Sequence, residues 1–90
     1  MEEKGKTIET LADTVDLMNS SAYEDRFKAE YYQLKIRIEK LKAMIEKHDA
    51  GTLEFEMKTP ITVHKEQLRA MMDYMDMLKA RSNFEHVEVE

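Results

Sequence analysis

The chain has 90 residues, a net charge of −5 and no cysteine, so it has room for one small domain and no disulfide to brace it. No apolar run approaches the roughly 20 residues that span a bilayer, and no amino-terminal segment has the form of a signal peptide, so we expect a cytoplasmic protein with no membrane partner. The two segments with helical periodicity are mildly basic, and everything around them is acidic. Without a dominant basic face, the composition argues against sequence-specific nucleic-acid binding.

The first predicted element is a short helix at residues 7–19. Its apolar side chains recur on one face, and Thr7 is placed to cap its first turn. We expect this helix to lie against the elements that follow it. The apolar face consists of Ile8, Leu11, Ala12, Val15 and Met18.

Two longer helices are predicted at residues 22–48 and 60–82. Each carries an apolar stripe at alternating spacings of four and three residues, a pattern that lets two helices pack antiparallel along one seam. The fold class is therefore all-α, a long antiparallel helical hairpin with a short N-terminal helix, in one domain. The seam consists of Phe27, Tyr31, Leu34, Ile38, Leu41, Ile45 and His48 on the first arm and of Ile61, His64, Leu68, Met71, Met75 and Leu78 on the second.

Local signals mark where these helices begin and end. Ser21 and Glu24 form a capping box at the start of the first arm. Gly51 can end that arm in the left-handed conformation. The second arm is expected to begin with Thr59 as its cap and Pro60 in its first turn.

Two short segments, 53–57 and 85–89, alternate apolar and polar residues in the manner of half-buried strands. They fall at opposite ends of the hairpin, so they could pair only between subunits arranged head to tail. The alternative is an ordered turn at the tip of the hairpin and a frayed acidic tail at residues 83–90.

Both long helices carry apolar side chains away from the seam. A small monomer seldom exposes a contiguous apolar patch without a use for it, so we expect a homo-oligomer, either a dimer or a higher even assembly. The alternative is that the N-terminal helix covers this surface completely. The candidate interface residues are Tyr32, Ile36, Met72, Tyr74 and Met77.

A basic cluster on the first arm is the candidate ligand site. Lysine and arginine can hold phosphates while tyrosine rings stack on bases, so a groove between subunits could take a small nucleotide. The simpler interpretation is a solvated helix face, because Glu39 and Glu46 are interspersed at helical spacing. The candidate residues are Tyr31, Tyr32, Lys35, Arg37, Lys42, Arg69 and Tyr74.

Catalytic and metal-binding patterns are sparse. The chain has no cysteine nucleophile, no glycine-rich phosphate loop and no HExxH spacing. His48, His64 and Asp49 are the one suggestive metal-ligand set, but two histidines without a defined third ligand do not make a site. We therefore expect a protein that is not an enzyme and needs neither cofactor nor metal.

The arms carry a further pattern, which is Leu34–Ile45 on the first and Gln67, Leu68, Met71, Tyr74, Leu78 and Arg81 on the second. This pattern resembles a small family of bacteriophage proteins first annotated in crAss-like phages. The resemblance covers residues 26–82 and implies a phage-encoded accessory protein built on one helical hairpin, with no known catalytic residue.

Small phage proteins that are not enzymes often act by occupying a host component, so the resemblance implies a role in counter-defence. The protein would bind a host defence protein or sequester a cyclic nucleotide immune signal. The alternative is a structural or regulatory hairpin that assembles only with itself or with a phage protein.

Overall fold

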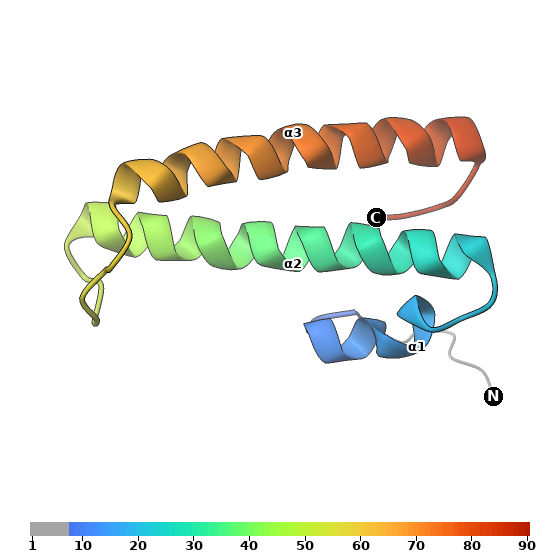
Figure 1. The fold of residues 1–90 in the computed structure, drawn as a ribbon, viewed down its shortest axis with the longest axis horizontal. Coiled ribbons are helices and arrows are strands. Elements are labelled where there is room, and N and C mark those ends of the chain that lie inside the picture. The colour runs from blue at the N-terminus through green and yellow to red at the C-terminus, as the bar shows by residue number, and fades with distance from the viewer. Residues whose placement is uncertain (1–7) are drawn as a thin grey trace.

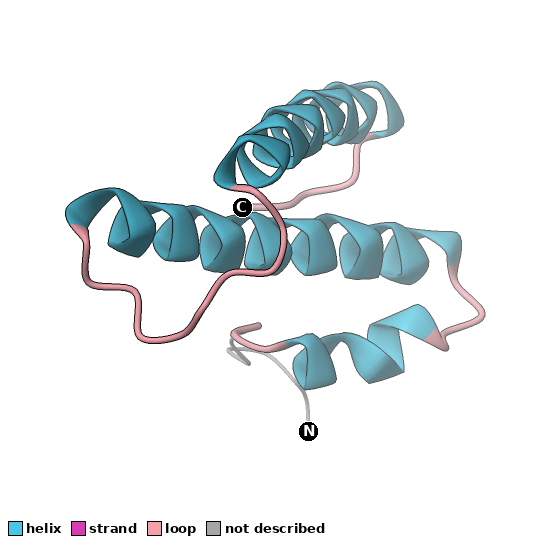
Figure 2. Cartoon of the chain, turned by 60° about the vertical axis from the view of Figure 1, so that its left-hand side comes forward, coloured by secondary structure: helices cyan, strands magenta, loops and turns pink. Residues whose placement is uncertain are grey.

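The computed structural model describes residues 8–90, and every regular element in that range is helical (Figure 1). Helices α2 and α3 run antiparallel, and the N-terminal elements lie on the side of α2 away from α3, as a second view also shows (Figure 2). The all-helical class is confirmed, with α2 and α3 as the arms of a hairpin. The elements are the 3-10 turn η1 (Leu11–Thr14), α1 (Val15–Met18), α2 (Tyr23–Ala50) and α3 (Ile61–Glu85).

The N-terminal helix begins later than predicted. The carboxylate of Asp13 accepts the backbone N–H groups of Glu9 at 2.9 Å and of Thr10 at 3.0 Å, and these two bonds start the turn of η1. The helix then ends at Met18. The predicted cap, Thr7, lies outside the described residues.

Thr14 fixes these N-terminal elements on α2. Its buried hydroxyl donates to the backbone carbonyl of Leu11 at 2.7 Å and accepts the side-chain amide of Gln33 at 2.9 Å. Ala29 and Ile36, about one turn before and after Gln33, are buried on the same face of α2. The N-terminal elements therefore pack on the hairpin as predicted.

The first turn of α2 is held by Ser20, so the predicted capping box of Ser21 and Glu24 is wrong. The hydroxyl of Ser20 accepts the N–H of Ala22 at 3.0 Å and donates to the carboxylate of Asp25 at 2.8 Å. The pair that bonds at this turn is Ser20 with Asp25, whereas the predicted pair was Ser21 with Glu24.

The loop between the arms begins and ends close to its predicted positions. Gly51 has a φ of 76°, and the N–H groups of Gly51 and Thr52 bond to carbonyls in the last turn of α2 at 3.0 and 2.9 Å. Helix α3 begins after Pro60, whose carbonyl accepts the N–H of Val63 at 3.0 Å. It continues to Glu85, one turn beyond the predicted end.

The predicted strands at 53–57 and 85–89 are wrong, because neither segment is a strand within residues 8–90. A strand needs a second strand with which to pair, and every regular element in residues 8–90 is helical. The carboxy-terminal residues instead turn back at His86, which has a φ of 59°. The N–H of Val87 then bonds to the carbonyl of Ser82 at 3.0 Å and closes the end of α3.

The core lies between α2 and α3. It combines seam residues of both arms with Val87, of which only 5% is exposed. The acidic tail at residues 83–90 is therefore not a frayed end, because it supplies part of the core through the hydrophobic effect. The buried members of this core are Phe27, Tyr31, Leu34, Met75, Leu78 and Val87.

Candidate functional site

A groove of about 360 Å³ opens between α2 and α3 beside the core. Its α2 residues recur at spacings of three and four, so they occupy one side of that helix, and its α3 residues do the same. Both helices thus turn one flank toward a common space. The lining consists of Tyr31, Lys35, Ile38, Glu39, Lys42, Met72, Met75, Asp76, Lys79 and Glu90.

The groove combines an apolar floor with a charged rim. Met75 is buried and Ile38 is half-buried, and both belong to the core region or pack against it. The cationic part of the rim consists of Lys35, Lys42 and Lys79, none of which forms an ion pair with any residue from 8 to 90. Such ammonium groups beside an apolar surface suit a ligand that carries both an anionic group and a flat ring.

Tyr31 forms the inner wall of the groove. Only 2% of it is exposed, and its hydroxyl donates to the backbone carbonyl of Glu90. Burial raises the pKa of Tyr31 above its ordinary value of 10.0, and repulsion from the neighbouring Tyr32, when it is ionised, and from Glu90 adds to that shift. The hydroxyl is therefore a proton donor at neutral pH.

Three of the seven predicted ligand residues meet in this groove, namely Tyr31, Lys35 and Lys42. Tyr32 sets its ring edge-on to Tyr31 at a centroid distance of 5.2 Å and packs on the core. Arg37 and Arg69 are exposed and lie outside the groove lining. The remaining residue, Tyr74, lies on the opposite flank of the seam.

Sequence reasoning missed Lys79, although the pattern contains a signal for it. Lys35 and Lys42 each follow directly after a seam leucine of α2, and Lys79 follows directly after Leu78 of α3. Residues in that position flank a helix-packing seam on one side. Arg37 precedes a seam residue instead, which places it on the other side.

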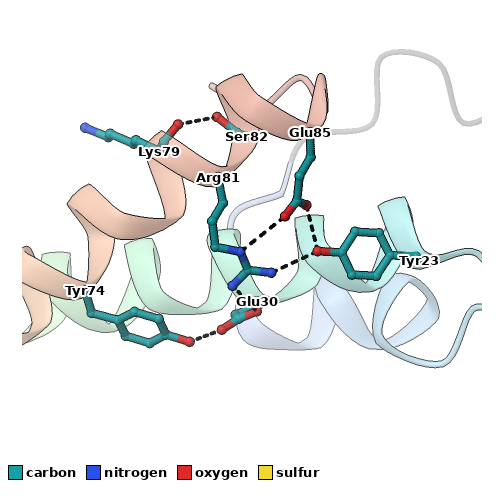
Figure 3. A network of polar contacts seen from close by, with 7 residues as sticks. All are labelled: Tyr23, Glu30, Tyr74, Lys79, Arg81, Ser82 and Glu85. Atoms are coloured by element: carbon teal, nitrogen blue, oxygen red, sulfur yellow. Dashed lines mark hydrogen bonds and ion pairs between the residues drawn. The ribbon is translucent and has the colours of Figure 1, made fainter.

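The flank opposite the groove carries a polar network that joins the two arms (Figure 3). The hydroxyl of Tyr23 donates to the carboxylate of Glu85 at 2.7 Å and accepts the guanidinium of Arg81 at 2.9 Å. Arg81 also forms an ion pair with Glu85 at 3.6 Å along α3. These contacts fix the start of α2 against the end of α3.

The same network continues toward the middle of the hairpin. Arg81 lies 4.0 Å from the carboxylate of Glu30, which also accepts the hydroxyl of Tyr74 (Figure 3). The guanidinium lies 4.9 Å from the centre of the Phe27 ring, where a cation–π contact is favourable. Tyr74 is thus bonded within the chain on this flank and does not face the groove.

The predicted interface residues do not form one patch. Ile36 is buried beneath the N-terminal elements, Met72 lines the groove, and Tyr74 belongs to the polar network. Met77 points away from the seam and is 60% exposed. A different stripe appears on the outer face of α3, where four apolar residues recur every seven positions, namely Val63, Ala70, Met77 and Phe84.

The tip of the hairpin holds a small ionic cluster and no metal-binding group. The carboxylate of Asp49 lies 3.2 Å from Nδ1 of His48 and 3.4 Å from Nζ of Lys65. The hydrogen bond with His48, followed by that with Lys65, lowers the pKa of Asp49. Within residues 8–90, no three His, Asp or Glu side chains are grouped so that they could hold a metal ion.

No helix in the described range is long and apolar enough to cross a membrane.

Comparison with known proteins identifies a family for most of this hairpin. The family model described as Sequestin matches residues 21–84, which include α2, the connecting loop and nearly all of α3. The match contains the whole range of the predicted resemblance, residues 26–82. No curated protein and no solved structure matches the chain.

Proposed function

The chain belongs to the Sequestin family, and from this membership we propose that it is a binding protein that sequesters a small anionic ligand rather than an enzyme. The family's name points to a sequestering role. The observation that carries the ligand class is the groove between α2 and α3, where three lysines that form no ion pair within residues 8–90 lie around an apolar floor.

A cyclic nucleotide is the ligand class that best matches this groove. Its phosphates would bind the ammonium groups of Lys35, Lys42 and Lys79, and its base would lie on the methionine and isoleucine side chains of the floor. The volume of about 360 Å³ lies within the roughly 300–1,000 Å³ of typical small-molecule pockets. A second subunit that covers the open side would bury such a ligand more completely, so we propose a homo-oligomer.

If a phage carries the gene, the cyclic nucleotide that the protein sequesters would be an immune signal of the host. A protein that removes a cyclic nucleotide from the host cytoplasm needs affinity and sufficient copies of itself, and it needs no turnover. The carboxylates that line the groove, Glu39, Asp76 and Glu90, are exposed to solvent, which favours binding over general acid–base chemistry in a dry site.

Calorimetric titration with a panel of cyclic mono- and dinucleotides tests this function. We expect one member of the panel to bind, and we expect Lys35→Ala and Lys42→Ala each to weaken that binding about tenfold, since each removes a charge-assisted hydrogen bond. Arg37→Ala is the matched control, because it removes one positive charge from α2 outside the groove. Equal losses from all three variants, or no binding by any nucleotide, would contradict the proposal.

A second candidate function is capture of a protein partner by the outer face of α3. The observation that favours it is the seven-residue repeat of exposed apolar residues, in which Phe84 is 84% exposed. The partner would be a host defence protein, a phage protein or another copy of the chain. Affinity capture from bacterial lysate and solution mass, each measured for the native chain and for Phe84→Lys, test this role, and identical results for both proteins would count against it.

A further inference from the structure

The last five residues, 86–90, which we call the strap, end at the proposed ligand groove, where Glu90 forms part of the lining. Figure 1 shows the chain turning back after α3 and running between the two long helices. Val87 is buried in the core, and Val89 packs against it. The backbone carbonyl of Glu90 accepts the hydroxyl of Tyr31, and Glu90 itself lines the groove.

The strap is held in place by the buried side chain of Val87, the partly buried side chain of Val89 and a few polar bonds. Its polar bonds run from the backbone N–H groups of His86 and Val87 to the carbonyl of Ser82 and from the hydroxyl of Tyr31 to the carbonyl of Glu90, and no strap residue forms an ion pair with any part of the described chain. A short segment that is held by so few groups opens locally at lower free energy than the core helices do.

The strap also begins at an unfavourable backbone conformation. His86 has a φ of 59°, in the left-handed region that side chains with a Cβ seldom adopt. Glycine adopts that region without penalty, yet a histidine stands here. The closed strap is therefore less stable with His86 than it would be with a glycine at this residue.

We infer that the strap is a displaceable occupant of the groove, and that a bound anion and the closed strap exclude one another. This inference rests on the proposed function. Glu90 brings negative charge to a groove whose lysines would hold the ligand's phosphates, so a bound anion repels it. The ligand also competes for the hydroxyl of Tyr31, which the strap occupies in the closed form.

Such competition makes the apparent affinity depend on how often the strap is open. When only a fraction of molecules is competent to bind, the apparent dissociation constant rises in inverse proportion to that fraction. His86→Gly favours the closed strap and should weaken ligand binding roughly two- to fivefold. His86→Ala keeps the conformational penalty and serves as the matched control.

Amide hydrogen exchange in the full chain tests the inference with and without a nucleotide. In the free protein, the Val87 amide should exchange at least tenfold faster than that of Leu78 in the middle of the core, because the strap opens on its own. His86→Gly should slow exchange of the Val87 amide several-fold and leave exchange of the Leu78 amide unchanged. His86→Ala should slow exchange of the Val87 amide less than His86→Gly does. Saturating cyclic di-AMP, the probe nucleotide, should accelerate Val87 exchange.

Different results of this experiment contradict the displaceable strap and the proposed function. Equal protection of Val87 and Leu78 in the free protein, or slower Val87 exchange after the nucleotide binds, overturns the displaceable strap and leaves sequestration intact. Failure of cyclic di-AMP to bind overturns the proposed function for that nucleotide and removes the coupling, even if the strap opens alone.

Discussion

The two flanks of the α2–α3 seam use their charges in opposite ways. On one flank, Arg81 contacts Tyr23, Glu30 and Glu85, so its charge is neutralised inside the chain (Figure 3). On the other flank, the lysines of the groove have no such partners among residues 8–90.

This difference indicates that one flank of the hairpin contributes to stability and the other to ligand binding. Charges that are paired across two helices hold those helices in register, while charges left unpaired beside an apolar floor remain free to bind something else. Substitutions on the first flank should therefore change stability, and substitutions on the second should change ligand binding. Substitutions in the core between them should affect both flanks.

Leu78→Ala should have the largest effect, because Leu78 is completely buried where the two flanks meet. We expect the free energy of unfolding to fall by about 2–5 kcal/mol, which is a large part of the stability of so small a domain. Met77→Ala, at the preceding and mostly exposed position, should change it by less than about 0.5 kcal/mol. Urea unfolding of both variants measures the contrast, and similar losses would show that the core is not where we place it.

Lys79 and Arg81 lie two positions apart on α3 but on different flanks, so substituting each of them tests whether one flank serves stability and the other ligand binding. Arg81→Met should lower the free energy of unfolding, since it removes the contacts with Tyr23, Glu30 and Glu85 that join the two arms. Lys79→Met should leave stability within about 0.5 kcal/mol of the native value and should weaken nucleotide binding. The account of the two flanks fails if Lys79→Met destabilises the chain more than Arg81→Met does.

The smallest expected effect is a pH dependence at Tyr31. Because its pKa is raised above 10.0 in the folded chain, the protonated hydroxyl is favoured there, and the stability that it provides is present at neutral pH. That stability is lost as the pH rises above 10 through the folded-state pKa. Between pH 8 and the alkaline range, the native chain should lose about 0.5–1 kcal/mol more stability than Tyr31→Phe, as measured by urea unfolding.

The hairpin itself was predictable because its signals are local. The spacing of the seam residues fixes helical periodicity, and Gly51 marks the end of α2 in the conformation that glycine favours. The bonds at the start of α2 were harder to predict, because Ser21 and Glu24 fit the capping pattern while Ser20 and Asp25 form the bond.

The strap was predictable only in part. The alternation of Val87 and Val89 indicates correctly that these side chains pack inward, and Val87 is buried and Val89 partly buried, but it does not say what they pack against. They pack on the seam of their own hairpin and form no strand, and that contact joins residues nearly 60 positions apart. No local pattern encodes a contact of that length.

The candidate site was also only half predictable. A cluster of positive residues on α2 is visible in the sequence, but the rotation of the helix decides which of them share a flank. Lys35 and Arg37 are two positions apart and therefore point in nearly opposite directions around the helix. Tyr74 could not be excluded from the site without the position of its acceptor, Glu30, on the other arm.

Mapping of amide chemical shifts during titration with the nucleotide that binds best is the most direct test of the central claim. We predict that the largest changes occur at Lys35, Lys42 and Lys79, with small changes at Tyr23 and Arg81 on the opposite flank. Changes concentrated on the Arg81 flank, or spread evenly over both flanks, would contradict the assignment of ligand binding to the groove.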